Sequence, residues 1–367
     1  MKVSKIPGLG RFGIYIDDVD LQNISDQEWM EIGQLHLDSL VTIIRNSNLT
    51  TDRQSELMLK FGEPRHGQKV TMARKYQQRY GKDFHWVAQQ VRDDSPMIDE
   101  EDKLRIRSLG SMATVTSTGY MVAKVAGGYD ENGLPKGMFA DGELLWHSNE
   151  SGTLTACPGV GLFAHSNVVG SSTGFVTTPD YYESLSESFR SELDEMVILH
   201  RFQPGKINPG LNEAHDLIMN ANMCPVSDAE VPLVIQSPGG IKGLHYSSNT
   251  VYQVKGMSKA ESDLLFERFN KELFVDKYVY DHWYKNDGDF VLFDNSITLH
   301  RRLGTTEGRL CYRGTFDYTH LQTEPYQPYF QHKYQRAYNK QIREVAKISE
   351  LEHFKLPHRT WRDFVPF

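Results

Sequence analysis

The sequence has few cysteines and no long hydrophobic run. Only Cys157, Cys224 and Cys311 occur in 367 residues, and their odd number and wide spacing fit neither a disulfide framework nor a zinc-type pair. We expect them to be small buried hydrophobes in a reducing, cytoplasmic setting. The longest apolar runs have strand length, which argues against a membrane helix. Residues 1–13 lack the apolar core of a signal peptide.

The sequence also lacks a basic tail, an internal repeat and a low-complexity linker. It has 40 Lys and Arg against 48 Asp and Glu, for a formal net charge of −8, and no block rich in Lys or Arg. Nucleic-acid binding is therefore not expected. Hydrophobic residues at 39% and charged residues at 24% are typical of a soluble globular protein. We expect one domain over residues 1–367, which is long enough to bury a large core.

Several short runs rich in β-branched and aromatic residues predict strands. They cover residues 111–125, 144–147, 161–165, 174–177, 231–237, 290–293 and 310–318. Helix starts are predicted by capping-box spacing or by proline at the first helical position: Ser25 with Glu28, Thr51 with Gln54, Thr178 with Pro179, and Ser258 with Glu261. We predict a mostly β protein with flanking helices and a double-stranded β-helix, or jelly-roll, core.

Three segments are predicted to lie outside that core. The amphipathic stretch between turn signals in residues 197–230 is expected to be an insertion or lid, and the Gly-rich loop 130–142 is a second lid candidate. Residues 324–367, rich in Tyr, Gln, Lys and Arg, form a C-terminal extension that wraps the surface or meets a partner subunit.

Two histidines far apart in sequence lie in strand-like segments. His147 ends the run from Leu144, and His300 follows Asp294-Asn295 by a few residues. Position 149 lies on the face of His147 if the strand continues, because side chains alternate along a strand. Arg309 and Arg313 are four apart and so share a face. Taken singly, each histidine is more typical of a core or surface residue, and each arginine of a surface ion pair.

The flanking residues strengthen the pattern. Leu145-Trp146-His147 resembles "WHxD", residues 170–175 resemble "GGdTxF", residues 231–240 resemble "hPlVrxHPxTG", and residues 282–300 resemble "hxWxxGDxxxWDNxxxxH". Residues 49–64 resemble an early "Lt…q…FG" segment. These motifs and their order resemble the taurine dioxygenase (TauD/TfdA-like) family of Fe(II)/2-oxoglutarate-dependent oxygenases over nearly the whole length.

This resemblance implies roles for particular residues. His147, position 149 and His300 would bind Fe(II), Arg309 with Thr173 would hold the distal carboxylate of 2-oxoglutarate, and Arg313 would lie near its chelating carboxylate. Guanidinium groups suit this task because they bind carboxylates with two hydrogen bonds. Thr114, Thr116 and Asn222 are candidate contacts for a small polar, amino-acid-like substrate. Asp294 and Asn295 are expected to shape a turn, and Trp146 and Trp283 to be core aromatics. Family members are often homo-oligomers, and we expect the same here.

The chain departs from the family at one position. Asn149 stands where the family has Asp or Glu. Asn149 could bind the metal through its amide oxygen or through water; a halide, chloride first, could fill the vacated place; or Glu150 could supply the carboxylate after a bulge. An engineered Asp-to-Asn change is a further possibility.

The predicted activity is hydroxylation of an unactivated C–H bond, using O₂ and releasing succinate and CO₂. A halogenase that uses the vacated position is the first alternative. A jelly-roll binding protein without catalysis is a second, and the retained histidines and arginines argue against it. A zinc hydrolase is a third, but it needs three protein ligands and a general base, and no His-Glu-x-x-His pattern occurs.

Overall fold

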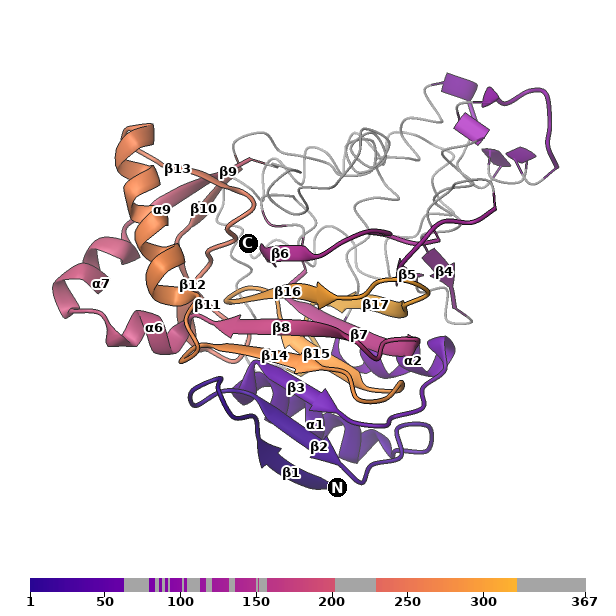
Figure 1. The fold of residues 1–367 in the computed structure, drawn as a ribbon, viewed down its shortest axis with the longest axis horizontal. Coiled ribbons are helices and arrows are strands. Elements are labelled where there is room, and N and C mark those ends of the chain that lie inside the picture. Colours follow the sequence, from indigo (N-terminus) through magenta and orange to yellow (C-terminus); the bar gives the residue numbers. More distant parts are fainter. Residues whose placement is uncertain are drawn as a thin grey trace.

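The computed structural model describes most of the chain. The described residues are 1–62, 79–82, 86–87, 90–91, 93–100, 102–103, 113–116, 121–131, 136–149, 151, 157–201 and 229–321. They form a mostly β protein with flanking helices, as the sequence predicts (Figure 1). Within these residues, no helix is long and apolar enough to cross a membrane.

The largest sheet has eight strands, in the order β1-β2-β3-β15-β7-β17-β5-β4. The strands are β1 (Lys2–Lys5), β2 (Ile14–Asp17), β3 (Val41–Ile44), β4 (Ala113–Val115), β5 (Met121–Ala126), β7 (Gly159–Ser166), β15 (Phe290–Asp294) and β17 (Leu310–Phe316). All neighbours are antiparallel except β2 and β3, which run parallel.

A second sheet has four antiparallel strands, in the order β14-β8-β16-β6. They are β14 (Val279–Trp283), β8 (Ser171–Thr177), β16 (Thr298–Gly304) and β6 (Leu144–His147). Two small sheets complete the β structure, formed by β9 (Val197–His200), β10 (Ala229–Pro232) and β13 (Val251–Val254), and by β11 (Val234–Gln236) and β12 (Lys242–Leu244).

The two large sheets pack face to face. Leu162, Val291 and Phe293 of the eight-stranded sheet form one buried cluster with Phe175 of β8. The rings of Phe175 and Phe293 are 5.4 Å apart across this interface. Because side chains alternate along a strand, Phe163 and Leu292, one residue along from these, lie on the opposite face of the sheet in a second cluster.

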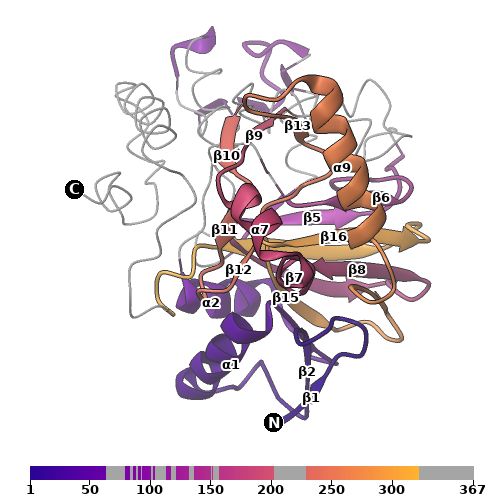
Figure 2. The same cartoon turned by 90° about the vertical axis from the view of Figure 1, so that its left-hand side faces the viewer.

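Helices cover the outer faces of the two sheets (Figures 1 and 2). The helices α1 (Asp26–Ser39) and α2 (Thr51–Phe61) pack on the eight-stranded sheet, where Trp29 and Phe61 stack with ring centroids 4.5 Å apart. On the other side, α6 (Pro179–Ser184) and α9 (Lys259–Leu273) bury their apolar residues with Val176 and Leu299 of the four-stranded sheet, and α7 (Glu187–Asp194) follows α6.

The helix starts follow the predicted signals with one correction. Ser25 and Ser258 each form a complete capping box, with Glu28 and Glu261. Pro179 occupies the first turn of α6. The prediction of Thr51 as the cap of α2 is wrong by one residue, because the Thr50 side chain accepts from the backbone N–H of Arg53.

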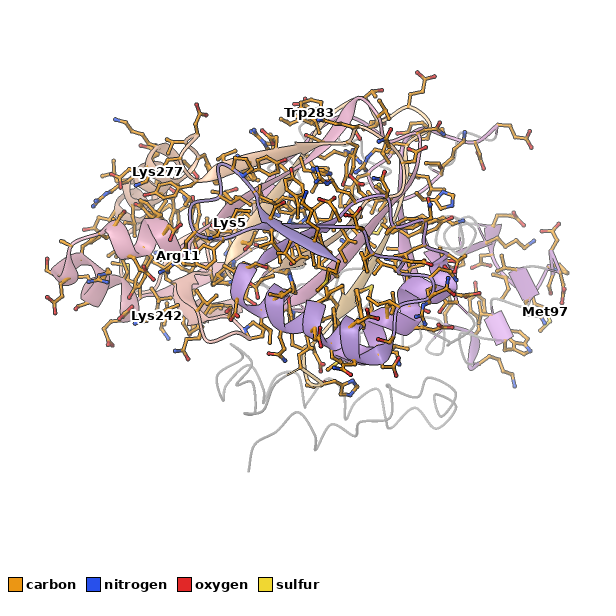
Figure 3. All side chains as sticks on the ribbon, turned by 90° about the horizontal axis from the view of Figure 1, so that it is seen from below. Lys5, Arg11, Met97, Lys242, Lys277 and Trp283 are labelled. Carbon is orange, nitrogen blue, oxygen red and sulfur yellow. The ribbon has the colours of Figure 1, made fainter. Side chains whose placement is uncertain are left out.

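Other predictions from the sequence can also be compared with the structure. The segment 231–237 is not one strand but two, since β10 ends at Pro232 and β11 begins at Val234. Trp283 is not a core aromatic: its side chain is 49% exposed at the surface (Figure 3). Cys157 and Cys311 are buried, as predicted, and neither forms a disulfide within the described residues. Cys224, most of the proposed lid at 197–230 and the extension 324–367 lie outside those residues.

Candidate functional site

His147 and His300 lie directly opposite each other on neighbouring antiparallel strands. They are register partners in the β6–β16 pair, and their ring centroids are 4.1 Å apart. The register shifts between this pair and the next, Arg302 with Leu144. This bulge lets Leu144 and His147, three residues apart, both face the same cavity, although regular alternation would place them on opposite faces.

Burial favours the neutral form of both imidazoles. Burial lowers the pKa of His147 to about 4, although a hydrogen bond to the Leu145 carbonyl favours the charged form. Burial, followed by the charges of His147 and Arg313, holds the pKa of His300 well below its ordinary value. Nδ1 of His147 donates to the Leu145 oxygen at 2.6 Å, because a carbonyl can only accept. Its Nε2 therefore keeps a lone pair, as a metal ligand requires.

Asn149 is buried beside the two histidines. Its Oδ1 accepts a hydrogen bond from Nη1 of Arg313 at 2.9 Å, and its Nδ2 has no partner. Its backbone is held by Asn295, whose Oδ1 accepts from the Asn149 N–H at 2.8 Å and whose Nδ2 donates to the Asn149 carbonyl at 2.9 Å. Arg313 thus holds the side-chain oxygen of Asn149, and Asn295 holds its backbone.

The turn between β15 and β16 supplies that support. Oδ1 of Asp294 accepts from the backbone N–H groups of Ser296 and Ile297, at 2.8 and 2.9 Å, which is the Asx turn that the sequence predicts. The turn places Asn295 against residue 149 and leads into the strand of His300. Asp294 and Asn295 are therefore structural, as expected, but Asn295 also positions a residue of the site.

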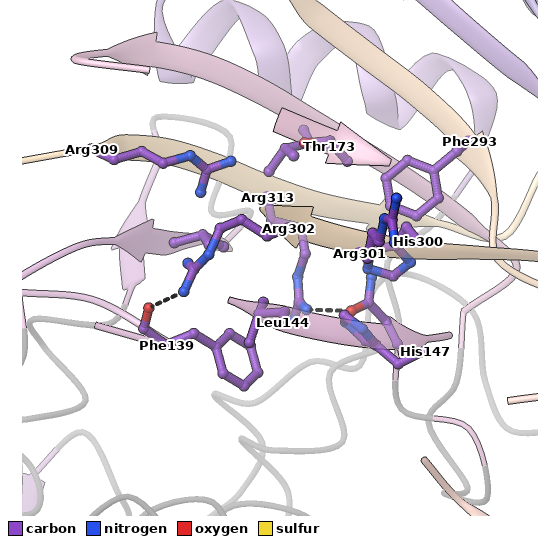
Figure 4. A pocket seen from close by; sticks show the side chains of 13 residues that line it. Phe139, Leu144, His147, Thr173, Phe293, His300, Arg301, Arg302, Arg309 and Arg313 are labelled. Atoms are coloured by element: carbon purple, nitrogen blue, oxygen red, sulfur yellow. Dashed lines mark hydrogen bonds between the residues drawn. The ribbon is translucent and has the colours of Figure 1, made fainter. Parts of the chain in front are cut away.

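Arg309 and Thr173 lie on the facing walls of the same cavity (Figure 4). Arg309 is 2% exposed; its Nε donates to the Ser171 hydroxyl at 3.1 Å, and its Nη1 has no hydrogen-bond partner. The Thr173 hydroxyl is 2.7 Å from the Tyr284 hydroxyl, which fixes its rotamer. An unsatisfied buried guanidinium next to a held hydroxyl is suited to a carboxylate.

The cavity lies between the two large sheets. Its volume is about 40 Å³. The histidines, Thr173 and Arg302 come from the four-stranded sheet or its edge, and Arg313 comes from β17 of the eight-stranded sheet, with Arg309 just before that strand. Apolar walls come from both sides: Val125, Phe139, Leu144, Leu162 and Phe293. No acidic side chain is among the described residues that line it, so these residues give the site a positive charge.

The predicted substrate contacts are less well placed. Thr116 is buried but is not among the residues that line the cavity. Thr114 lies in β4, at the edge of the eight-stranded sheet. Asn222 and Glu150 lie outside the described residues.

Two site residues were missed from the sequence, Arg302 and Tyr284. Arg302 lines the cavity from β16, and Tyr284 holds Thr173. A signal for Arg302 exists, because it is two residues after His300 and so lies on the same face of the strand. Tyr284 has no comparable signal, since its contact with Thr173 joins residues 111 positions apart.

The side chains of the site supply part of what a metal ion needs. The described residues hold no group of three or more His, Cys, Asp or Glu side chains that could bind a metal. They do hold two neutral, converging imidazoles, and Nδ1 of His300 is buried with no partner. Imidazole suits Fe²⁺, so the two histidines would fit iron, and the side chain nearby in place of a carboxylate is the neutral amide of Asn149.

Comparison with known proteins decides the family. Residues 3–315 match the family described as "Taurine catabolism dioxygenase TauD, TfdA family". The chain belongs to this family. The TauD/TfdA family is one of Fe(II)/2-oxoglutarate-dependent dioxygenases, so the protein is an oxidoreductase of that class. Among curated proteins, none matches the chain.

Solved structures share the fold. The structure of AAD-2 in complex with Mn(II) and N-oxalylglycine has a TM-score of 0.58 at 19% identity, covering 89% of this chain and 99% of that one. A taurine dioxygenase from Burkholderia xenovorans has a TM-score of 0.55 at 18% identity, covering 86% of this chain and 89% of that one. At such identities the likeness concerns the fold.

Proposed function

We propose that this protein is an Fe(II)/2-oxoglutarate-dependent oxygenase that hydroxylates an unactivated C–H bond of a small polar substrate, releasing succinate and CO₂. One observation carries the proposal: His147 and His300 meet as cross-strand partners, with ring centroids 4.1 Å apart, in a cavity also lined by Arg309 and Arg313. The two facing sheets support a double-stranded β-helix as the core that brings these residues together.

Different residues of the site would bind iron and 2-oxoglutarate. His147 and His300 would hold iron, and Arg309 with Thr173 would bind the distal carboxylate of 2-oxoglutarate. When bound, iron and 2-oxoglutarate supply the oxidising chemistry with O₂. The protein orients these partners and excludes water with the apolar walls of the cavity, which strengthens every charge interaction inside.

Asn149 determines how the site departs from a two-histidine, one-carboxylate arrangement. A carbonyl oxygen has two lone pairs, so Oδ1 can accept from Arg313 and still offer a neutral ligand, directly or through water. A neutral oxygen attracts Fe²⁺ less than a carboxylate does, and we expect weaker metal affinity. Because the Asn149 side chain itself lines the cavity, we favour this reading over a halide in its place.

Anaerobic titration followed by turnover tests the proposal. Fe(II) is added to metal-free protein, then 2-oxoglutarate and O₂, and succinate is measured with and without chloride. We expect iron binding and slow succinate formation that does not depend on chloride, because 2-oxoglutarate is consumed slowly even without the substrate. Absence of Fe(II) binding, or of any succinate above the iron-only background, would refute the proposed function.

A further inference from the structure

Arg302 is a third buried guanidinium in the site, and its position is unusual. Its side chain reaches from β16 into the cavity, and the residue is only 3% exposed (Figure 4). It follows His300 by two residues and is the register partner of Thr173 across the β16–β8 pair. Arg302 is therefore next to the side chain that would contact the distal carboxylate.

The guanidinium of Arg302 is only half satisfied. Its Nη2 donates to three backbone carbonyls, those of Phe139 at 2.9 Å, Asp141 at 3.1 Å and Gly142 at 2.6 Å. Its Nε and Nη1 are buried and have no hydrogen-bond partner. Buried polar groups without partners are rare and costly, so these donors indicate a missing acceptor.

The charge of Arg302 is also poorly compensated. Neither Arg302 nor Arg309 takes part in an ion pair within the described residues. The carboxylate of Asp141, whose backbone carbonyl accepts from Arg302, accepts instead from the Tyr129 hydroxyl. Two buried like charges in one cavity are costly without a counter-ion, and an anion bound between them would lower that cost.

We propose that Arg302 and Arg309 together form a two-arginine clamp for the distal carboxylate of the dicarboxylate cosubstrate, with Thr173 as a third contact. The geometry suits it: Nη1 of Arg309 and both Nε and Nη1 of Arg302 are donors without partners in one cavity. One carboxylate has two oxygens and about four acceptor sites, enough for both guanidinium groups. The clamp deepens the proposed function and rests on it for the identity of the ligand.

The same side chain joins cosubstrate binding to the neighbouring loop. The carbonyls that accept from Arg302 belong to residues 139–142, where Phe139 and Gly142 have positive φ angles of 58° and 62°. A positive φ is unfavourable for a bulky residue such as Phe, and the convergence of three carbonyls on one guanidinium helps to hold it. Phe139 in turn forms a wall of the cavity. Loss of Arg302 should therefore loosen this wall as well as the clamp.

Ligand binding to metal-free protein tests the clamp without iron. The probes are glutarate, a five-carbon dicarboxylate, and pentanoate, which has the same chain length but one carboxylate. Isothermal calorimetry of the wild type should show clear preference for glutarate. In R302M, which keeps the length of the side chain but removes its charge, glutarate affinity should fall by about 10- to 100-fold, as for the loss of charged hydrogen bonds. Pentanoate can place its single carboxylate in the same clamp, so its weaker binding should also fall in R302M.

The matched control is R301M. Arg301 is the adjacent residue in the same strand and is also among the lining residues. Its side chain alternates to the other face of the strand from that of Arg302, where the guanidinium forms a two-bond ion pair with Asp281 and stacks over Trp146. We expect R301M to keep the wild-type preference for glutarate. Equal glutarate affinity in R302M and R301M would overturn the clamp. If R302M does not fold, R302K decides: it keeps the charge but not the fork, and undiminished glutarate affinity in R302K would overturn the clamp.

Hydrogen exchange gives a second measurement that a purely structural role would not change. Glutarate should protect the amides of residues 136–142 in the wild type and in R301M, but not in R302M. A separate Mn(II) titration distinguishes the two proposals. If the protein binds glutarate but no metal, the clamp is supported and the proposed function is refuted. If it binds metal but no glutarate, the clamp is refuted and the proposed function stands.

Discussion

Two pairs of buried histidines occur within the part of the chain that the structure describes, and one of them lies in the candidate site. His147 and His300 have ring centroids 4.1 Å apart, and His200 and His245 have centroids 5.4 Å apart. In both pairs burial lowers the pKa of the imidazoles. In both pairs, one histidine donates Nδ1–H to a backbone carbonyl, that of Leu145 for His147 and that of Ser296 for His245.

The difference between the pairs lies in what surrounds them. The first pair lines a cavity with Arg302, Arg309 and Arg313, whereas the second is not among the residues lining that cavity. His200 instead contacts the Thr250 hydroxyl at 2.9 Å, near the strands of the small sheet. Two buried imidazoles thus occur in two different settings, and we expect a metal at the pair whose neighbouring cationic groups indicate a cosubstrate.

The largest expected difference concerns metal binding. H147A and H300A should each lower Fe(II) or Mn(II) affinity by on the order of 100-fold or more, because removal of a direct ligand costs at least as much as removal of its supporting partner. Succinate formation should be lost with it. H200N is the matched variant in the second pair and should keep both properties. An equal loss of metal affinity in H200N would show that the two pairs do not differ in metal binding.

The second pair should affect stability in acid. The pKa of His245 is about 4 in the folded protein against 6.5 for the free side chain. The unfolded chain binds more protons between these values, so the free energy of unfolding is fully retained above pH 6.5 and falls as pH drops toward 4. About 1.4 kcal/mol per pKa unit gives a loss of roughly 3 kcal/mol.

Urea unfolding at pH 7 and pH 4.5 measures this loss. H245N keeps a donor for the Ser296 carbonyl but does not titrate, so its unfolding free energy should fall less between the two pH values than that of the wild type. The exposed His165 provides the control, and H165N should behave as the wild type. If the unfolding free energy of H245N falls between the two pH values by as much as that of the wild type, His245 is not the cause of the acid destabilisation.

A carboxylate at position 149 should strengthen metal binding at the first pair. N149D adds an anionic oxygen beside the two imidazoles, and we expect metal affinity to rise by about 10- to 100-fold, comparable to the effect of other groups that tune metal ligands. N149A, which removes the acceptor for Arg313, should not raise it. Calorimetric titration with Mn(II) measures both. Equal affinity in N149D and the wild type would place residue 149 outside the coordination sphere.

The smallest effect concerns the hydroxyl that supports Thr173. Y284F removes its hydrogen-bond partner, which is worth about 0.5–1.5 kcal/mol. We expect the KM for 2-oxoglutarate to rise by about two- to tenfold, with little change in kcat. In the second pair, T250V removes the contact of His200 and should leave this KM unchanged. A larger effect of T250V than of Y284F would contradict the assignment of the cosubstrate to the first site.

Local signals in the sequence predicted much of the fold. The capping boxes at Ser25 and Ser258, and the proline in the first turn of α6, depend on residues within a few positions of one another. Strand existence was predicted by short apolar and aromatic runs, as for β6 and β15, which match within one residue. The split of 231–237 and the exposure of Trp283 were not predictable, because neighbours from distant segments decide both.

For the site, the residues around His147 and His300 predicted the family, and the match over residues 3–315 confirms it. The sequence alone determined which side chains are available: two histidines with their flanking motifs, two arginines four apart, and an asparagine in place of a carboxylate. Only the tertiary structure decided that the bulge in β6 turns Leu144 and His147 to one side, that Arg302 shares the cavity with Arg309, and that Arg313 approaches Asn149. The physical reason is that alternation along a strand defines two faces, but the packing of one sheet on another selects which face is enclosed.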